Sequence, residues 1–559
     1  MNNGDLAATN LRWALTLIDG LAASGVIHAV ISPGSRSTPL ALACDLHPGV
    51  TTHVVLDERS AAFFALGLAK ATGRPAAVVG TSGSAPANWF PAVIEANYGA
   101  VPLLLLSADR PPELRECGAN QTVDQIKLFG KHVRFAFDLG VPEASLLRHV
   151  AQRARQAADR SRWPLPGPVH LNVPLREPLV PMLLPEFAFS QPGATVVYPL
   201  LVPPAAEIAR LAGDLSGRPG MIVCGAAPYD GEFPAAVAAL AARLDCPLLA
   251  DPLSNLRFGN HDRSRILSHY DTFLRNPDFA SSHRPAWVLR FGALPLSKTL
   301  QSYLAAQDSA RHILVEAHGR WPDPLHLTAD LFHADPAALC QALVDEGVSA
   351  SAPDWLADFT EQEKRAAAYA GTLPLEAEIV RIMLERLPAG ATLFCGNSMP
   401  IRDLDSFSGS AAKPLRIVAN RGASGIDGNV STALGLAAAG GKVAALLGDL
   451  TCCHDSGGLI KARGLDIVLV VLNNGGGGIF SYLPQAGLAS FERLWLTPTG
   501  LDFEQMATLY GLAFQRVTRP QDFETALEQA LASPGPMLIE VMTDREESVA
   551  RHRAYWGSN

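Results

Sequence analysis

Two apolar stretches, VAALLGDL (443–450) and LDIVLVVLNNGGGGIF (465–480), set the pattern of the whole chain. Each contains an apolar run that suits a strand buried on both faces of a parallel sheet. The first run leads into Gly448 and Asp449, and the second leads into Asn474 and a row of glycines. Because ligands of an open parallel sheet lie beyond the carboxyl ends of its strands, we expect Asp449 and Asn474 to face one ligand.

The side chains at these strand ends are oxygen donors, and the glycines beside them leave the backbone open. One carboxylate and one amide suit a hard divalent cation such as Mg²⁺, which takes one or two protein groups together with phosphate oxygens. The four glycines 475–478 allow the backbone to approach closely and to offer a carbonyl and N–H groups to a metal-bound diphosphate. Alternatively, Asp449 and Asn474 only cap a helix and a turn. The combination of both strand ends favours the metal site.

Length and composition indicate a globular protein of about three domains, because single cores stop growing well below 559 residues. The chain is 48% hydrophobic and 18% charged, and its net charge of −9 disfavours a general nucleic-acid binder. Eight scattered cysteines without a Cys-x-x-Cys pair indicate reduced core thiols. The start has no signal-peptide pattern, and no apolar run is long enough for a membrane span. We therefore expect a soluble, cytoplasmic protein.

Alternating strand and helix patterns predict an α/β fold with three doubly wound parallel-sheet domains. The predicted domains cover residues 1–185, 200–350 and 370–559. A proline-rich stretch over 174–203 separates the first two domains, and a charged helix predicted over 351–372 connects the last two. The first and last domains show the same architecture.

Two loops of the first domain carry candidate binding groups. A predicted strand over 28–31 leads into SPGSRSTP (32–39) and then a helix, whose N-terminus presents N–H groups to an anion. Arg36 in this loop adds a forked donor for a carboxylate or phosphate, or it pairs with a nearby acid. Glu58 begins a further helix, where an acid ordinarily compensates the helix dipole.

The middle domain offers weaker signals. Its first strand ends in Gly225 without a Gly-x-Gly-x-x-Gly pattern, which disfavours a dinucleotide site. Lys298 is the candidate in this domain to reach a substrate carboxylate, although exposure to solvent is the commoner role of a lysine.

The pattern from Asp449 to Asn474, preceded by glycine, resembles the thiamine-diphosphate motif, which begins Gly-Asp and ends in Asn after a spacer. The resemblance implies that Asp449, Asn474 and the carbonyl of Gly476 hold Mg²⁺ or Mn²⁺. This sequence departs from the family at two positions. Leu450 stands where many relatives have Gly, and Gly475 stands where close relatives often have Asn.

Several loops are similar to one branch of this family, the menaquinone-pathway transferases that join 2-oxoglutarate and isochorismate. The matching loops are PGSRSTPL (33–40), ADRPPEL (108–114), CGANQ (117–121), GNS (396–398) and NRGASGIDG (420–428). Both substrates are dicarboxylates. Arg36, Arg402 and Arg421 stand at predicted strand ends, where forked guanidiniums suit carboxylates. A structural ion pair is the alternative for any one of them.

The resemblance implies a full set of site residues. Glu58 would be the catalytic group, hydrogen-bonded to N1′ of the aminopyrimidine, and Ile426 would hold the cofactor in a bent shape. The implied cofactor-binding residues are Glu58, Ser398, Ser424, Gly425, Ile426, Gly448, Asp449, Leu450, Asn474, Gly476, Ile479 and Phe480. The implied substrate-binding residues are Ser35, Arg36, Arg110, Asn120, Gln121, Lys298, Arg402 and Arg421. Family members join Glu58 and the diphosphate site across a subunit interface, which implies a homodimer or a dimer of dimers.

The implied reaction is the decarboxylation of 2-oxoglutarate and the addition of the succinyl semialdehyde unit to isochorismate, without release of pyruvate. One alternative is another thiamine-diphosphate 2-oxoacid decarboxylase or an acetolactate-type carboligase, which the arginines and the 420–428 loop disfavour. The other is a non-catalytic sensor that binds the cofactor.

Overall fold

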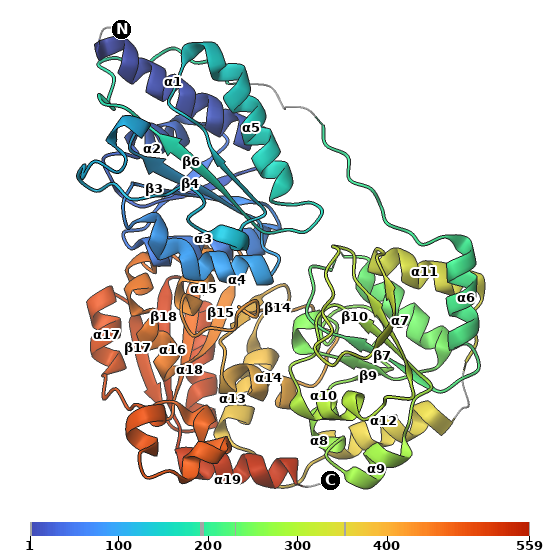
Figure 1. Cartoon of the computed structure of the whole chain (residues 1–559). Helices are drawn as coiled ribbons and strands as arrows, with labels where there is room; N and C mark the ends of the chain where they lie inside the picture. Colours follow the sequence, from blue (N-terminus) through green and yellow to red (C-terminus); the bar gives the residue numbers. More distant parts are fainter. Residues whose placement is uncertain (1–2, 190–194, 230, 351–353, 558–559) are drawn as a thin grey trace. The chain divides into compact units, whose positions relative to one another are not determined.

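The computed structural model describes residues 3–189, 195–229, 231–350 and 354–557. These residues form three parallel six-stranded sheets with helices packed on them (Figure 1). The predicted α/β class with three parallel sheets is confirmed. In the part of the chain that the structure describes, no helix has the length and apolar character needed to span a membrane.

The first sheet has the strand order β2-β1-β3-β4-β6-β5, so the order reverses between β1 and β3. Its strands are β1 (His28–Ile31), β2 (Thr51–Val54), β3 (Ala76–Gly80), β4 (Leu103–Asp109), β5 (Phe135–Asp138) and β6 (Pro168–Pro174). Its helices are α1 (Asn3–Ala22), α2 (Thr38–Leu46), α3 (Glu58–Thr72), α4 (Phe90–Tyr98) and α5 (Leu147–Arg160). The reversal places the loops after β1 and β3 beside each other at the carboxyl edge.

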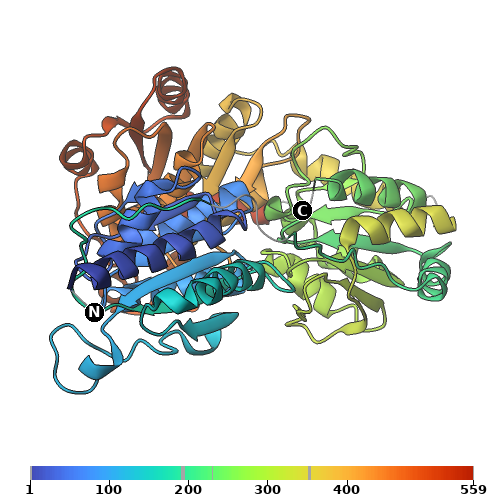
Figure 2. The ribbon, with the colours of Figure 1, turned by 90° about the horizontal axis from the view of Figure 1, so that it is seen from above.

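Helices cover both faces of the first sheet. α1, α2 and α5 share one apolar core with the strands, and α3 and α4 lie on the opposite face (Figure 1). α1 and α5 run side by side, as the second view also shows (Figure 2). On α3 every residue over 60–69 is buried, as expected for a helix enclosed on all sides.

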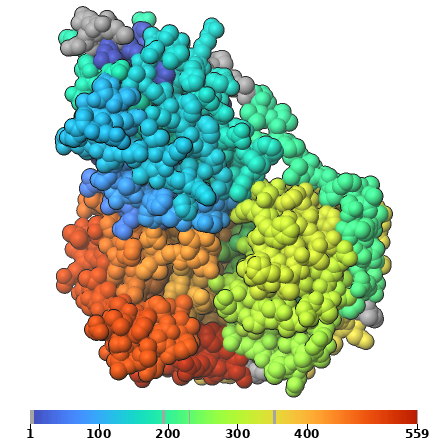
Figure 3. Space-filling model, viewed as in Figure 1, coloured from blue at the N-terminus to red at the C-terminus, as the bar shows by residue number. Residues whose placement is uncertain are grey.

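The middle sheet has the order β12-β11-β10-β7-β8-β9. Its strands are β7 (Gly220–Cys224), β8 (Leu248–Ala250), β9 (Ile266–Leu267), β10 (Trp287–Phe291), β11 (Arg311–Val315) and β12 (Thr328–Phe332). The helices of this region are α6 (Ala205–Leu215), α7 (Phe233–Leu244), α8 (Tyr270–Phe273), α9 (Pro277–Ser282), α10 (Lys298–Ala305), α11 (Pro336–Glu346) and α12 (Asp354–Ala367). Two apolar cores fill the two faces, and the residues form a closely packed body, drawn green to yellow in Figure 3. Of the helix predicted over 351–372, residues 351–353 lie outside the described residues, and α12 ends at Ala367.

The third sheet has the order β14-β13-β15-β16-β18-β17, with its reversal between β13 and β15. Its strands are β13 (Thr392–Cys395), β14 (Arg416–Val418), β15 (Val443–Gly448), β16 (Ile467–Asn473), β17 (Ala513–Val517) and β18 (Pro536–Met542). The helices of this region are α13 (Leu375–Arg386), α14 (Met399–Phe407), α15 (Asn429–Ala438), α16 (Asp449–His454), α17 (Phe503–Tyr510), α18 (Pro520–Ala532) and α19 (Arg545–Trp556). The loops after β13 and β15 therefore meet at the position where such sheets bind ligands.

The chain packs into two compact units, one built on the first sheet and the other on the middle and third sheets. One contains residues 1–198, 420–440 and 451–467, and the other contains the remaining residues. Within the second unit, Arg257 is fully buried after β8 and donates from Nη2 to Oδ1 of Asp405 on α14 at 2.6 Å. Its Nη1 donates to the backbone oxygen of Asp405 at 2.6 Å, and Tyr270 donates to the same carboxylate at 3.0 Å. Three buried side chains thereby join the middle sheet region to α14.

Candidate active site

Asp449 lies beside the glycine row, as predicted from the ends of the two strands. Its Oδ2 accepts the N–H of Gly476 at 2.7 Å, and its Oδ1 accepts the N–H of Leu450 at 2.6 Å. Asp449 is 6% exposed, and this burial raises its pKa to about 6 against the lowering effect of the backbone hydrogen bonds. α16 begins at Asp449, directly after β15, so no loop separates the strand from the helix here.

Two glycines after β16 lie so close to neighbouring atoms that a side chain would not fit. Gly476 has φ of +136°, and a Cβ there would lie 2.1 Å from the carbonyl oxygen of Leu496. A Cβ at Gly478 would lie 2.3 Å from Nδ2 of Asn474. Larger residues at these two positions would displace the Leu496 segment or the Asn474 amide.

The polar groups here fit a hard cation with few protein ligands. Oδ1 of Asn474 is buried and accepts no hydrogen bond, which is costly unless another group binds it. The carbonyl of Gly476 accepts the N–H of Gly478 at 2.9 Å and keeps a second lone pair. Among the described residues no three acidic, histidine or cysteine side chains form a metal cluster. A metal bound at Asp449 and Asn474 would therefore need oxygens from another bound group.

The loop after β13 carries a strained residue next to the start of α14. Ser398 has φ of +74°, an uncommon value for a residue with a Cβ, and Nη1 of Arg402 donates to its carbonyl oxygen. The sheet reversal places this loop next to the end of β15. Ser398 and Arg402 therefore lie at the same carboxyl edge as Asp449.

Glu58 belongs to the other unit, where it begins α3. Asp57 caps the helix, accepting the N–H of Ser60 at 3.0 Å, and Glu58 is partly exposed. α3 packs closely on α15 because both helices carry glycine at the contact. A Cβ at Gly67 would lie 2.1 Å from the carbonyl oxygen of Thr432, and one at Gly435 would lie 2.0 Å from that of Phe64.

The loop 420–428 precedes α15 in the same unit. It contains Ser424, with φ of +63°, followed by Gly425 and Ile426. A cavity of about 220 Å³ opens between this loop and helices α3 and α4. Its walls include Phe63, Phe90, Ile94, Glu95, Ala423 and Gly425. The cavity is mostly apolar and has room for an aromatic ring.

Arg36 and Arg110 lie in one cluster at the carboxyl edge of the first sheet. Arg36 is 5% exposed, and it donates to Oε1 of Glu177 at 2.6 Å and to the carbonyl oxygen of Leu175 at 2.9 Å. Burial and the nearby charge of Arg36 lower the pKa of Arg110, which donates to Oγ of Ser82. The side chain of Glu177 is 69% exposed, so a substrate carboxylate can reach the position it occupies.

The remaining predicted residues of this region lie at the surface of the cluster. Gln121 donates from Nε2 to the carbonyl oxygen of Ser82 at 3.0 Å, while Ser35 and Asn120 are exposed. Ser82 and Glu177 were not predicted as site residues. The Gly/Ser-rich loop after β3 was a signal for Ser82, whereas nothing in the sequence pointed from Arg36 to Glu177.

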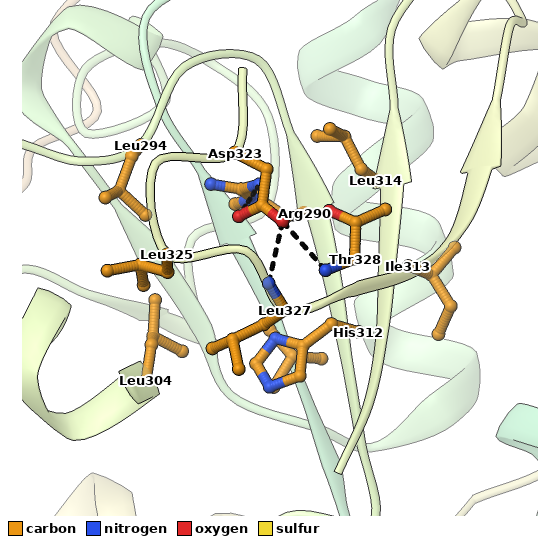
Figure 4. Close-up of a pocket in the computed structure, with 11 residues that line it drawn as sticks. Arg290, Leu294, Leu304, His312, Ile313, Leu314, Asp323, Leu325, Leu327 and Thr328 are labelled. Carbon is orange, nitrogen blue, oxygen red and sulfur yellow. Dashed lines mark hydrogen bonds and ion pairs between the residues drawn. The ribbon is translucent and has the colours of Figure 1, made fainter. Parts of the chain in front are cut away.

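One ion pair of the middle region lies beside a small cavity. Nη2 of Arg290 lies 3.1 Å from Oδ1 of Asp323, whose Oδ2 accepts the backbone N–H groups of Leu327 and Thr328 (Figure 4). The space beside this pair is about 10 Å³, enough for about one water molecule. Lys298 begins α10 with an exposed side chain that donates to Oε1 of Gln301 at 3.0 Å.

Three family models match successive parts of the chain. They describe the N-terminal TPP binding domain of thiamine pyrophosphate enzymes (residues 12–128), their middle domain (209–395) and their C-terminal TPP binding domain (406–541). Thiamine pyrophosphate (TPP) is another name for thiamine diphosphate. A 2-succinyl-5-enolpyruvyl-6-hydroxy-3-cyclohexene-1-carboxylate synthase from Dechloromonas aromatica is 47% identical over 96% of this chain and 99% of its own length. The chain belongs to this synthase family.

Further synthases are similar to this chain over nearly its full length. The enzyme of the same name from Geobacillus kaustophilus is 46% identical over 97% of both chains, and that from Chloroflexus aurantiacus is 46% identical over 98% of this chain and 95% of its own. The crystal structure of a benzoylformate decarboxylase from Polynucleobacter necessarius superposes with a TM-score of 0.71 over 95% of this chain and 98% of its own. At 16% identity that likeness shows the fold alone.

Proposed function

We propose that the chain catalyses the synthase reaction: decarboxylation of 2-oxoglutarate and transfer of the succinyl semialdehyde unit to isochorismate in menaquinone biosynthesis. The observation that carries the proposal is the buried, unpartnered Oδ1 of Asn474 beside Asp449 and Gly476, in a chain related to these synthases over nearly its full length. A hard cation with a diphosphate would use that oxygen, and a structural loop would leave it unsatisfied.

Asp449, Asn474 and the carbonyl of Gly476 would hold Mg²⁺ or Mn²⁺, and the glycine row would approach the diphosphate. Glu58 would share a proton with N1′ of the aminopyrimidine. Ile426, between a strained serine and α15, would support the centre of the cofactor. Bound thiamine diphosphate supplies a nucleophilic carbon for the keto group of a 2-oxoacid and accepts the electron pair released with CO₂.

The arginines would select dicarboxylates. Arg36 and Arg110 in one cluster, with the exposed Glu177 as an exchangeable partner, suit one dicarboxylate substrate. Arg402 and Arg421, with Lys298, are proposed for the other carboxylates. Ser35, Asn120 and Gln121 would donate hydrogen bonds at the rim of the cluster.

We also propose a homodimer or dimer of dimers, in which Glu58 of one subunit and Asp449 of another serve one active site. A cytoplasmic location is proposed from the cysteines, all eight of which are free thiols and most of which are buried.

Product analysis tests the reaction. The chain, Mg²⁺ and thiamine diphosphate should release CO₂ from 2-oxoglutarate and consume isochorismate in equal amounts when both substrates are present. Release of free succinic semialdehyde with no consumption of isochorismate would indicate a simple decarboxylase. Tight cofactor binding without any turnover would indicate a sensor.

Metal dependence tests the cation site. Calorimetric titration with thiamine diphosphate should give binding with Mg²⁺ and little or none after chelation. Asp449→Ala should abolish the thiamine diphosphate binding that depends on Mg²⁺. Equal binding with and without metal would contradict the proposed role of Asp449.

A further inference from the structure

Glu95 is a buried acid that the proposed reaction does not use. It lies on α4 and is 3% exposed. Its two oxygens accept two consecutive backbone N–H groups, Oε1 from Gly422 at 2.8 Å and Oε2 from Ala423 at 2.7 Å. Burying a carboxylate is costly, and hydrogen bonds from N–H groups to a charged acceptor repay part of that cost.

The loop residue Gly422 is pressed against the end of α4. A Cβ at Gly422 would lie 2.3 Å from the carbonyl oxygen of Glu95 and 2.6 Å from the backbone nitrogen of Gly99. Lys70 on α3 adds a positive charge, with its Nζ 3.9 Å from Oε1 of Glu95. The carboxylate and the close backbone contact thus fix the position of residues 422 and 423 relative to α3 and α4.

The residues that follow this fixed point are those proposed to contact the cofactor. Ser424 takes a left-handed conformation with φ of +63°, which costs energy and persists only when its surroundings impose it. Glu95 itself forms part of the wall of the 220 Å³ cavity, together with Ala423 and Gly425 of the loop. A shift of residues 422 and 423 would therefore change both the cavity and the approach to Ile426.

We propose that Glu95 is a positioning residue that holds the 420–426 loop in the shape that accepts the aromatic ring of the cofactor. This inference rests on the proposed function, because it assigns the cavity beside the loop to thiamine diphosphate. Glu95 acts through the backbone of Gly422 and Ala423 and touches no reacting atom.

The test compares two matched substitutions, Glu95→Gln and Glu316→Gln. Glu316, in the middle region, is also a buried glutamate that accepts two backbone N–H groups: its Oε2 accepts those of His318 at 2.7 Å and Arg320 at 2.9 Å, and its Oε1 accepts Nε–H of Arg320 at 3.0 Å. Each variant replaces one accepting oxygen by an NH₂ group that faces an N–H donor. The dissociation constant of thiamine diphosphate with Mg²⁺ is measured by calorimetry, and the unfolding midpoint of the cofactor-free chain is measured alongside.

Both variants should lower the unfolding midpoint, but only Glu95→Gln should weaken cofactor binding, by about tenfold or more. Equal weakening in both variants, or unchanged binding in Glu95→Gln, would overturn the inference. If Glu95→Gln does not fold, the comparison uses Glu95→Asp, which keeps the negative charge on a shorter side chain. Unchanged cofactor binding in Glu95→Asp would also overturn the inference.

Amide hydrogen exchange separates this inference from the proposed function. In the cofactor-free chain, the N–H groups of Gly422 and Ala423 should exchange faster in Glu95→Gln than in the unchanged chain, and exchange at similar rates would overturn the positioning role. Failure of the unchanged chain to bind thiamine diphosphate with Mg²⁺ would overturn the proposed function, whatever the exchange rates.

Discussion

The carboxylates of Glu58 and Asp449 differ in how firmly the structure holds them. Asp449 is held by two backbone N–H groups, so its carboxylate is aimed before any ligand arrives. Glu58, by contrast, has a fixed backbone at the start of α3 and a partly exposed side chain. Its proposed role depends on the ring it would meet.

Glu58→Gln should leave thiamine diphosphate binding nearly unchanged and slow turnover by about 10²- to 10⁴-fold, because the amide cannot share a proton with N1′. Steady-state rates with 2-oxoglutarate and isochorismate measure the effect, and calorimetry measures binding. The control is Glu361→Gln on the exposed face of α12, where the side chain is 53% exposed and pairs with Arg365. Full activity in Glu58→Gln would remove Glu58 from the mechanism.

At the scale of elements, α3 and α15 pack directly on each other in the first unit. The pair matters because Glu58 begins α3 and the Ser424–Ile426 turn precedes α15. Glycine at positions 67 and 435 allows the two backbones to touch.

Gly435→Ala should destabilise the chain by about 1–3 kcal/mol, because its Cβ would overlap the carbonyl oxygen of Phe64. Urea unfolding measures the change. Gly213→Ala on α6 is the control, since a Cβ there meets nothing within 4 Å, and we expect it to stabilise the chain by about 0.5–1 kcal/mol. If Gly435→Ala stabilised the chain as Gly213→Ala is expected to do, the packing argument would be wrong.

A second element-scale feature is a buried network around His552 on α19. Its Nε2 lies 3.0 Å from Oδ1 of Asp403 on α14, and its Nδ1 lies 2.8 Å from the carbonyl oxygen of Ser548. Tyr482, in the turn after the glycine row, and Glu376 on α13 also face it. Burial lowers the pKa of His552, but the hydrogen bond and charge of Asp403 and the charge of Glu376 outweigh it and raise the pKa overall.

This raised pKa predicts a pH-dependent contribution to stability. The folded state favours the protonated ring, so its contribution is complete below the unfolded value of about 6.5 and is lost as pH rises through the folded pKa. His552→Gln should therefore cost about 1–3 kcal/mol at about pH 6 and less at about pH 9. Urea unfolding of both proteins at the two pH values gives the difference, and a cost that grows with pH would refute the assignment.

At the scale of the whole molecule, the proposed dimer brings Glu58 of one subunit and Asp449 of its partner into one active site. Glu58 belongs to the first unit and Asp449 to the second. Most soluble oligomers are symmetric, so a dimer with shared sites would contain two equal ones.

Mixed dimers test this sharing. A chain with Glu58→Gln and a chain with Asp449→Ala, each inactive alone, are co-expressed with different tags, and the mixed dimers are purified. One site of each mixed dimer would be intact and the other doubly altered, so about half the activity of the unchanged dimer should return. No recovery would place both residues of each site in one chain.

The sequence was most informative where apolar runs and glycines combine. The runs at 443–447 and 467–472 predicted β15 and β16, and the loops at 33–40 and 420–428 pointed to the family that the relatives confirm. β5 and β6 were not assigned, and neither was α19, whose helical pattern has a weak apolar face. The domain limits 1–185, 200–350 and 370–559 stay a prediction.

Contacts between distant segments could not be predicted from the sequence. The sequence left open whether Arg36 binds a carboxylate or phosphate or forms a structural ion pair. Only the fold brings Glu177 beside it. The role of Glu95 depends on a loop more than three hundred residues away, and no local pattern reports that contact. Assignment of the individual site residues therefore stays a prediction from the family resemblance.

The buried trio of Arg257, Asp405 and Tyr270 limits how the protein can be recombined. Removing one member of a buried ion pair leaves an uncompensated charge, at a cost of about 3–5 kcal/mol. A chimaera that takes its middle region from a distant homologue would make such a mismatch at the graft boundary unless the donor carries both Arg257 and Tyr270. The middle region can thus be exchanged only if α14 is replaced together with it, or if the donor has the same three side chains.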